Sequence, residues 1–225
     1  MRKDEEKALE WADVKRDWPL WVFMAGLFIA AFLLYPHLPE QVPRHWNLRG
    51  EVDAYYSRRL YGAFCMPVTT LVLYLMLIIL PRLDPKKENY SRFAGAYTFI
   101  RWMMVLFFGV FYGVTILAAL GYNLNMAMVI KIMTALVFIM IGNFMGQFRH
   151  NYFVGIKTPW TLADEQVWQK THRLGAKVWV IGGLFCLASA FVNGGLGMII
   201  FLIAVTVMAG LPVIYSYLIF TKLKG

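Results

Sequence analysis

The most regular feature of this sequence is a series of long apolar runs separated by polar connections. An α-helix of about 20 apolar residues crosses a bilayer core about 30 Å thick. Six runs approach this length with at most one charge each: residues 18–35, 61–80, 102–120, 126–145, 176–192 and 196–220. The pattern therefore predicts an all-α integral membrane protein with six transmembrane helices.

Composition and charge agree with a membrane protein and predict its orientation. Hydrophobic residues make up 60% of the chain and charged residues 16%, which excludes disorder and is not typical of a soluble domain. Seventeen of the 22 Lys and Arg residues lie in segments on one side of the predicted bundle. Because basic segments stay inside, we predict a multi-pass protein of the cell membrane with its N- and C-termini cytoplasmic. The net charge of +9 is then explained by basic segments beside the lipid bilayer, and we predict no direct nucleic-acid partner.

Two connections are long enough to have structure of their own. The chain is predicted to comprise a cytoplasmic N-terminal segment (1–17) and two three-helix halves (18–120 and 121–225). The first half contains an external loop, 36–60, and the second a cytoplasmic connection, 147–175. Because long structureless loops are uncommon unless they function, both are candidate sites. The basic stretch 81–92 is predicted to lie against anionic lipid.

The external loop has the pattern of a small β-hairpin. Turn-forming residues from Asn47 to Gly50 separate two short stretches that contain Trp46 and Val52. In one interpretation the loop is a ligand-binding head, with candidate residues His45, Trp46, Asn47, Gly50 and Asp53. In the other, its aromatic residues anchor the loop at the membrane interface and its polar residues form turns.

The cytoplasmic connection predicts a helix and two polar stripes. Thr161 and Asp164 have capping-box spacing, so a helix is expected to begin near Leu162. One face of this helix is predicted to carry Glu165, Trp168, His172 and Trp179. A second stripe, four residues apart, consists of Asn143, Gln147 and Asn151. These stripes either hold two helices in register or form a ligand site.

Both long segments resemble a known family. The connection reads Gly-Ile-Lys-Thr-Pro-Trp-Thr-Leu over residues 155–162, followed by Trp168 and Thr171-His172, and this resembles the signature of the SdpI family of bacterial membrane immunity proteins. The external loop resembles the uncharacterised domain that commonly precedes that signature, through Leu38-Pro39, Val42-Pro43, His45-Trp46-Asn47, Gly50 and Asp53. Lys157 stands where the family usually has Arg, which alone can bind carboxylate or phosphate with two parallel hydrogen bonds.

The resemblance implies resistance to a secreted antimicrobial toxin peptide, with the external residues as its first contact. It also implies that the connection captures a winged-helix transcriptional repressor at the membrane and so transduces a signal. The implied partner-binding residues are Asn151, Gly155, Lys157, Thr158, Pro159, Trp160, Thr161, Trp168, Thr171 and His172.

Two other classes of function remain open, a transporter for a small solute or peptide and an envelope enzyme of unknown reaction. The sequence lacks His-Glu-x-x-His, Gly-x-Ser-x-Gly and a phosphate-binding glycine loop, so we predict no enzyme, no cofactor and no metal site. No Asp or Glu falls inside a predicted helix, which disfavours coupled transport. Lys131 does, and its ammonium group is expected to reach outward to water.

Overall fold

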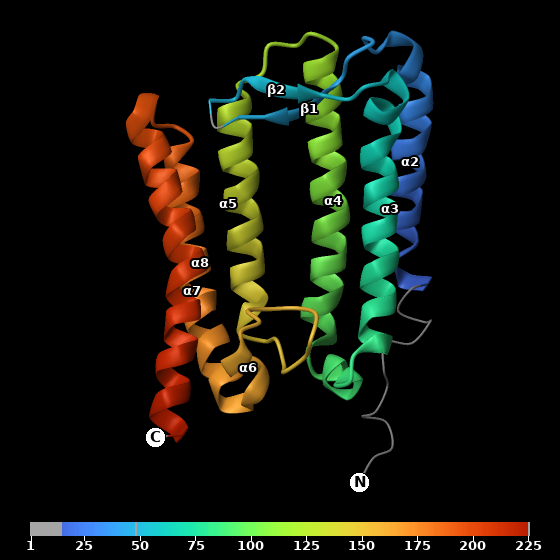
Figure 1. The fold of residues 1–225 in the computed structure, drawn as a ribbon. Coiled ribbons are helices and arrows are strands. Elements are labelled where there is room, and N and C mark those ends of the chain that lie inside the picture. Colours follow the sequence, from blue (N-terminus) through green and yellow to red (C-terminus); the bar gives the residue numbers. More distant parts are fainter. Residues whose placement is uncertain (1–14, 48, 225) are drawn as a thin grey trace. The chain divides into compact units, whose positions relative to one another are not determined.

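A computed structural model describes residues 15–47 and 49–224, and most of this chain is helical (Figure 1). Five helical segments are long and apolar enough to cross a membrane. They are formed by α2 (Trp18–Leu34, continued by the 3-10 helix η1, Tyr35–His37), α3 (Arg59–Leu83), α4 (Ala94–Ala119, preceded by η2, Lys87–Phe93), α5 (Met126–Met145) and α8 (Gly194–Lys224). These helices support a multi-pass membrane protein.

The sixth predicted membrane segment lies in a helix of mixed character. Helix α7 (Glu165–Ser189) joins the predicted helix of the connection and the apolar run 176–192 into one element. It is not among the five segments above. The six-helix topology and the cytoplasmic location of both termini therefore stay predictions.

The chain divides into two compact units. Among the described residues, the hairpin unit contains 15–79 and 99–130, and the connection unit contains 80–98 and 131–224. The predicted N-terminal segment 1–17 lies outside the described residues up to position 14. Helices α3, α4 and α5 each contribute residues to both units, so each unit is described separately.

The hairpin unit contains the predicted β-hairpin. Strand β1 (Pro43–Trp46) pairs antiparallel with β2 (Val52–Tyr55), and Trp46 lies opposite Val52. Gly50 has φ +80°, and an added Cβ would collide with the backbone of Ala127 at the start of α5. A glycine is therefore required at this turn. The core beneath the hairpin is formed by Ala31, Leu38, Val42, Ala63, Tyr112 and Ile116.

A buried ion pair joins α2 and α4 within the hairpin unit. Helix α4 begins at Ala94, eight residues before the predicted start, so Arg101 lies inside the helix and not in a basic connection. Its Nη2 is 2.7 Å from Oδ2 of Asp17, and both side chains are 1% exposed. Tyr74 and Trp102 also donate hydrogen bonds to this carboxylate. The predicted start of this helix at residue 102, which left Arg101 outside it, was therefore wrong.

In the connection unit, α7 packs through glycines. An added Cβ at Gly182 would collide with Met208 of α8, and one at Gly183 with Ile139 of α5. Small residues allow helix backbones to approach closely, which favours association of helices in a membrane. The core of this contact is formed by Ala135, Cys186, Ala204 and Met208.

Lys131 was predicted to reach outward to water, and the structure places it differently. Its side chain is 7% exposed, and its Nζ donates a hydrogen bond of 3.3 Å to the carbonyl oxygen of Ser189, the last residue of α7. The final carbonyl groups of a helix have no partner within the helix and carry partial negative charge. The ammonium group therefore caps α7.

Candidate functional site

The signature connection (residues 147–175) begins with a loop organised by Asn151. Helix α5 ends at Met145, so Asn151 does not continue the predicted stripe of Asn143 and Gln147, both of which are exposed. The Asn151 amide instead donates to the carbonyls of Arg149 and Val154 and accepts from the N–H groups of Phe153 and Val154, at 2.7–2.9 Å. It is fully buried. The Asn151 side chain thus satisfies backbone groups of the loop that have no partner in regular secondary structure.

His172 holds the next part of the loop against α7. Its Nε2 accepts a hydrogen bond of 2.9 Å from Ile156 N–H, and its Nδ1 lies 2.8 Å from the Trp168 carbonyl. These partners fit a neutral ring protonated at Nδ1. Burial is the main cause that lowers the pKa of His172 to about 4. Gly155 has φ +121°, and a Cβ there would collide with the His172 ring.

Trp168 completes this cluster as a core residue. Its ring stacks on His172 with a centroid distance of 4.0 Å, and its Nε1 donates to the Phe148 carbonyl at 2.9 Å. It is fully buried, whereas Glu165, predicted for the same face, is exposed. Trp168 thus anchors the loop after α5 to α7, and it is not available to a docking partner in this conformation.

Two threonines form the cap that starts α6 (Pro159–Ala163). Thr158 is the N-cap, and Thr158 and Thr161 exchange side-chain to backbone hydrogen bonds. Thr161 is therefore the third residue of a helix, and the predicted box of Thr161 with Asp164 was wrong. Asp164 is the N-cap of α7, with its Oδ1 accepting from two backbone N–H groups. Thr158 also contacts Ser216 of α8 at 3.0 Å.

A buried aspartate that the sequence analysis did not select joins the connection to the segment 80–98. Asp84 is 2% exposed and accepts hydrogen bonds from Tyr90 Oη and Tyr152 N. In the same segment, Lys86 Nζ lies 3.0 Å from Nδ1 of His150. Burial, followed by the charge of Lys86, lowers the pKa of His150. The stretch 81–92 therefore folds onto the connection in part and does not lie wholly against lipid.

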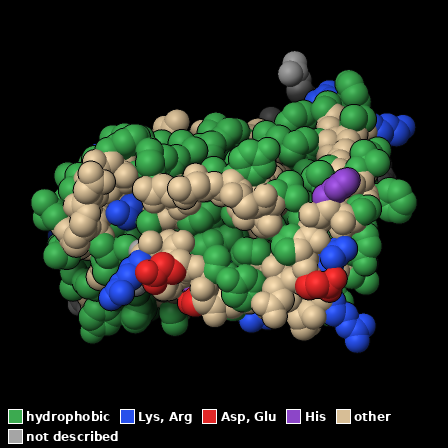
Figure 2. All heavy atoms as spheres, turned by 90° about the horizontal axis from the view of Figure 1, so that it is seen from above, with side chains coloured by type: hydrophobic (Ala, Val, Ile, Leu, Met, Phe, Trp, Pro, Cys, Tyr) green, Lys and Arg blue, Asp and Glu red, His purple; other side chains and the backbone are tan. Residues whose placement is uncertain are grey.

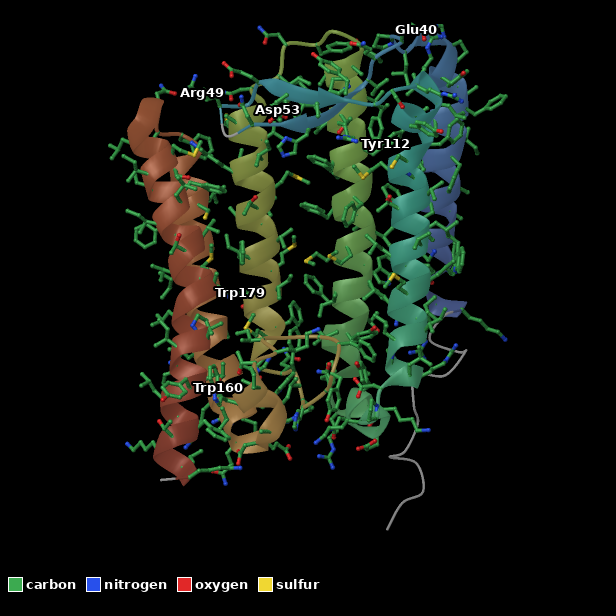
Figure 3. The ribbon with its side chains drawn as sticks, viewed as in Figure 1. Glu40, Arg49, Asp53, Tyr112, Trp160 and Trp179 are labelled. Atoms are coloured by element: carbon green, nitrogen blue, oxygen red, sulfur yellow. The ribbon has the colours of Figure 1, made fainter. Side chains whose placement is uncertain are left out.

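Few of the ten implied partner-binding residues point outward. Gly155 is partly buried, and six others are buried: Asn151, Thr158, Thr161, Trp168, Thr171 and His172. Lys157 is exposed, with its Nζ donating to the Phe153 carbonyl at 3.1 Å, and Pro159 is also exposed. Trp160 is half-buried against Tyr217, with ring centroids 5.1 Å apart (Figure 3).

The hairpin residues divide in the same way. Trp46 is buried edge-on against Phe111, and Asn47 forms the turn by accepting from the N–H groups of Arg49 and Glu51. His45 and Asp53 face solvent, with 2.6 Å between Nδ1 and Oδ1. Figure 3 places Asp53 and Arg49 on the hairpin. Asn47 thus forms a turn as in the second interpretation, whereas Trp46 packs inside the protein and not at the membrane interface, and the exposed pair of His45 and Asp53 is what a ligand could contact.

These features define a class: a multi-pass helical membrane protein with an exposed hairpin and a hydrogen-bonded connection between helices. Within the described residues there is no group of three or more His, Cys, Asp or Glu side chains placed to hold a metal ion. Residues 147–216 match the SdpI/YfhL protein family, and residues 22–71 match a domain of unknown function, DUF1648. The predicted resemblance is confirmed.

A curated relative extends this similarity along most of the chain. The chain is 28% identical over 198 residues to the protein named "Immunity protein SdpI" from Bacillus subtilis (strain 168). The match covers 88% of this chain and 92% of the relative, so it includes both long connections. No solved structure matches the chain.

Proposed function

We propose that this chain is a membrane immunity protein that protects its producer from a secreted toxin peptide. The observation that carries the proposal is the similarity to an immunity protein over 88% of the chain. The motif residues of both segments have structural functions, in the hydrogen bonds of the connection and in the turn of the hairpin. None of these functions requires a catalytic group.

The toxin contact is proposed at the exposed pair on the hairpin. His45 and Asp53 retain 66% and 44% of their side-chain exposure, and each can still bond to a peptide group. Trp46, Asn47 and Gly50 hold this pair in place, through the Phe111 contact, the turn and the tight approach to α5. His45 and Asp53 thus contact the toxin, and the other three residues position them.

The test is survival of a sensitive bacterial strain in medium conditioned by the toxin producer. Expression of the chain is expected to protect the cells, and the double variant His45→Gln, Asp53→Asn to lose about tenfold in tolerated toxin concentration, since lost charge-assisted hydrogen bonds cost about 1.5 kcal/mol or more. Arg49→Gln on the same hairpin is the matched control. No protection by inserted protein contradicts immunity and favours a transporter or an envelope enzyme.

The same cells, supplied with the repressor and a reporter gene under the immunity promoter, test whether the connection also signals. Capture of a winged-helix repressor is proposed at its outward residues, Lys157 and Trp160, because the buried members are engaged inside the fold. Lys157→Ala is expected to lower expression from the immunity promoter and to leave survival and the amount of inserted protein unchanged. Joint loss of survival and expression contradicts a separate docking surface.

A further inference from the structure

A groove runs beside the hairpin along the start of α3. Its volume is about 630 Å³. Two rows of α3 residues spaced four apart line it, so it extends roughly 12 Å along the helix at 1.5 Å per residue. The lining residues are Arg44, Tyr55, Tyr56, Ser57, Leu60, Tyr61, Phe64, Cys65, Val68 and Thr69.

The charge of this groove is unbalanced. Arg44 contributes a cation, and the lining includes no carboxylate. The neighbouring Arg59 pairs with Glu40 at 2.7 Å, and Asp53 lies against His45. Within the described part of the chain, Arg44 has no ion pair, and its side chain is exposed. Its guanidinium group is therefore free for an external anion, and its planar donors match a phosphate.

The rest of the lining is suited to a hydrocarbon chain. Leu60, Phe64 and Val68 form one row of apolar side chains. Helix α3 is one of the five candidate membrane helices, so its first turns lie where the bilayer core meets the polar boundary. Tyr55 and Tyr61, each 48% exposed, have the amphipathic character typical of that boundary. The face seen in Figure 2 also mixes charged side chains with a large hydrophobic area.

We propose that this groove binds one anionic phospholipid, with its phosphate on Arg44 and an acyl chain against Leu60, Phe64 and Val68. A free phosphate ion would use the cation and leave the apolar row uncovered. A zwitterionic lipid such as phosphatidylcholine also offers a phosphate to Arg44, but its choline cation repels the guanidinium group and makes the pairing weaker. An anionic phospholipid satisfies both parts of the groove and is present at the membrane boundary at high concentration.

Native mass spectrometry of the full-length protein tests the polar half. The delipidated protein in detergent is titrated with phosphatidylglycerol or with phosphatidylcholine of identical acyl chains. One phosphatidylglycerol is expected to be retained in preference. Arg44→Gln should weaken its binding about fivefold, the contribution of one basic residue near an anionic lipid. Arg49→Gln, which removes an exposed cation from the same hairpin, should leave binding unchanged.

A pair of α3 variants tests the apolar half. Val68 lines the groove, and Val72 lies one turn further along α3 with nearly the same exposure, 46% against 48%. Val68→Trp should fill the groove and weaken binding of both lipids, whereas Val72→Trp should not. An unchanged thermal transition shows that each variant is folded.

The native cysteines provide a third measurement. Cys65 lines the groove and is exposed, whereas Cys186 is fully buried. Phosphatidylglycerol should slow maleimide labelling of Cys65 in the wild type at a concentration about fivefold lower than in Arg44→Gln. Equal affinity for both lipids, or binding that neither Arg44→Gln nor Val68→Trp weakens, overturns the proposal. Protection of Cys65 by toxin-conditioned medium and not by phosphatidylglycerol also overturns it. Loss of the immunity function alone leaves these lipid results standing.

Discussion

His172 is stabilised in its neutral form by the groups around it. The N–H of Ile156 needs an acceptor, which a protonated ring cannot supply, and the stacked Trp168 excludes water. The ring is 1% exposed. A residue that resembles a ligand in the sequence therefore works as the acceptor that closes the loop over α7.

The lowered pKa predicts a pH dependence of stability. Between its ordinary pKa of about 6.5 and the folded value of about 4, the unfolded chain binds a proton that the folded chain does not. The free energy of unfolding should therefore fall by about 2 kcal/mol from pH 7 to pH 5 and level off below pH 4. Thermal unfolding in detergent measures this.

The control for this prediction is His172→Gln. It has no titrating group at this position, so its stability should fall less between pH 7 and pH 5 than that of the wild type, whatever its stability at pH 7. An equal pH dependence in the two proteins would show that other groups, such as His150, are responsible.

At the scale of elements, α7 is determined by what packs against it. Gly183 faces both a side chain and the backbone of α5, and an added Cβ would lie 2.7 Å from Ile139 Cγ1 and 3.1 Å from the Ala135 carbonyl oxygen. Backbone cannot move aside as a flexible side chain can. A single methyl group at this position must therefore separate the two helices.

Substitution of alanine for glycine is expected to have opposite effects in α7 and α8. Gly183→Ala should destabilise the protein by about 1–3 kcal/mol through overpacking. Gly210→Ala in α8, where an added Cβ meets nothing within 4 Å, should be neutral or stabilising because alanine favours the helix. Thermal unfolding of both variants in one detergent compares them. Equal losses of stability would mean that helix propensity, and not the α5 contact, governs position 183.

The length of the hydrophobic runs predicted most of the helices, whereas the polar residues predicted few of the contacts that the structure contains. The run 126–145 coincides with α5, because a charge-poor stretch of that length has few alternatives to a helix. The start of α4 was placed eight residues late because Arg101 was counted as a loop residue, and its partner, Asp17, is remote in sequence. Asp84 was missed for the same reason: its acceptor function depends on Tyr152, which no spacing rule connects to it.

At the scale of the whole molecule, two ion pairs of equal length differ in their surroundings. Asp17–Arg101 and Glu40–Arg59 both have an N–O distance of 2.7 Å. Both side chains of the first pair are 1% exposed, whereas Glu40 is 86% exposed. A buried charge that loses its partner stays desolvated, and an exposed one returns to water.

Removal of the two carboxylates should therefore have unequal effects. Asp17→Asn is expected to destabilise the protein by about 3 kcal/mol or more, because Arg101 is left buried without a counter-charge. Glu40→Gln should cost less than about 1 kcal/mol. Thermal unfolding of the two variants measures the difference. Similar small losses would indicate that water reaches Arg101.

The Asp17–Arg101 pair also constrains the order of assembly during synthesis. Trp102, which donates to the same carboxylate, lies 85 positions after Asp17, so two helices and the hairpin are made before Arg101 and Trp102 exist, and only Tyr74 of α3 is made earlier. Until then the carboxylate at the start of α2 has the Tyr74 hydroxyl as a donor but no counter-charge. Helix α4 therefore closes the hairpin unit last among its three long helices, and a chain truncated before residue 101 leaves α2 without its electrostatic partner.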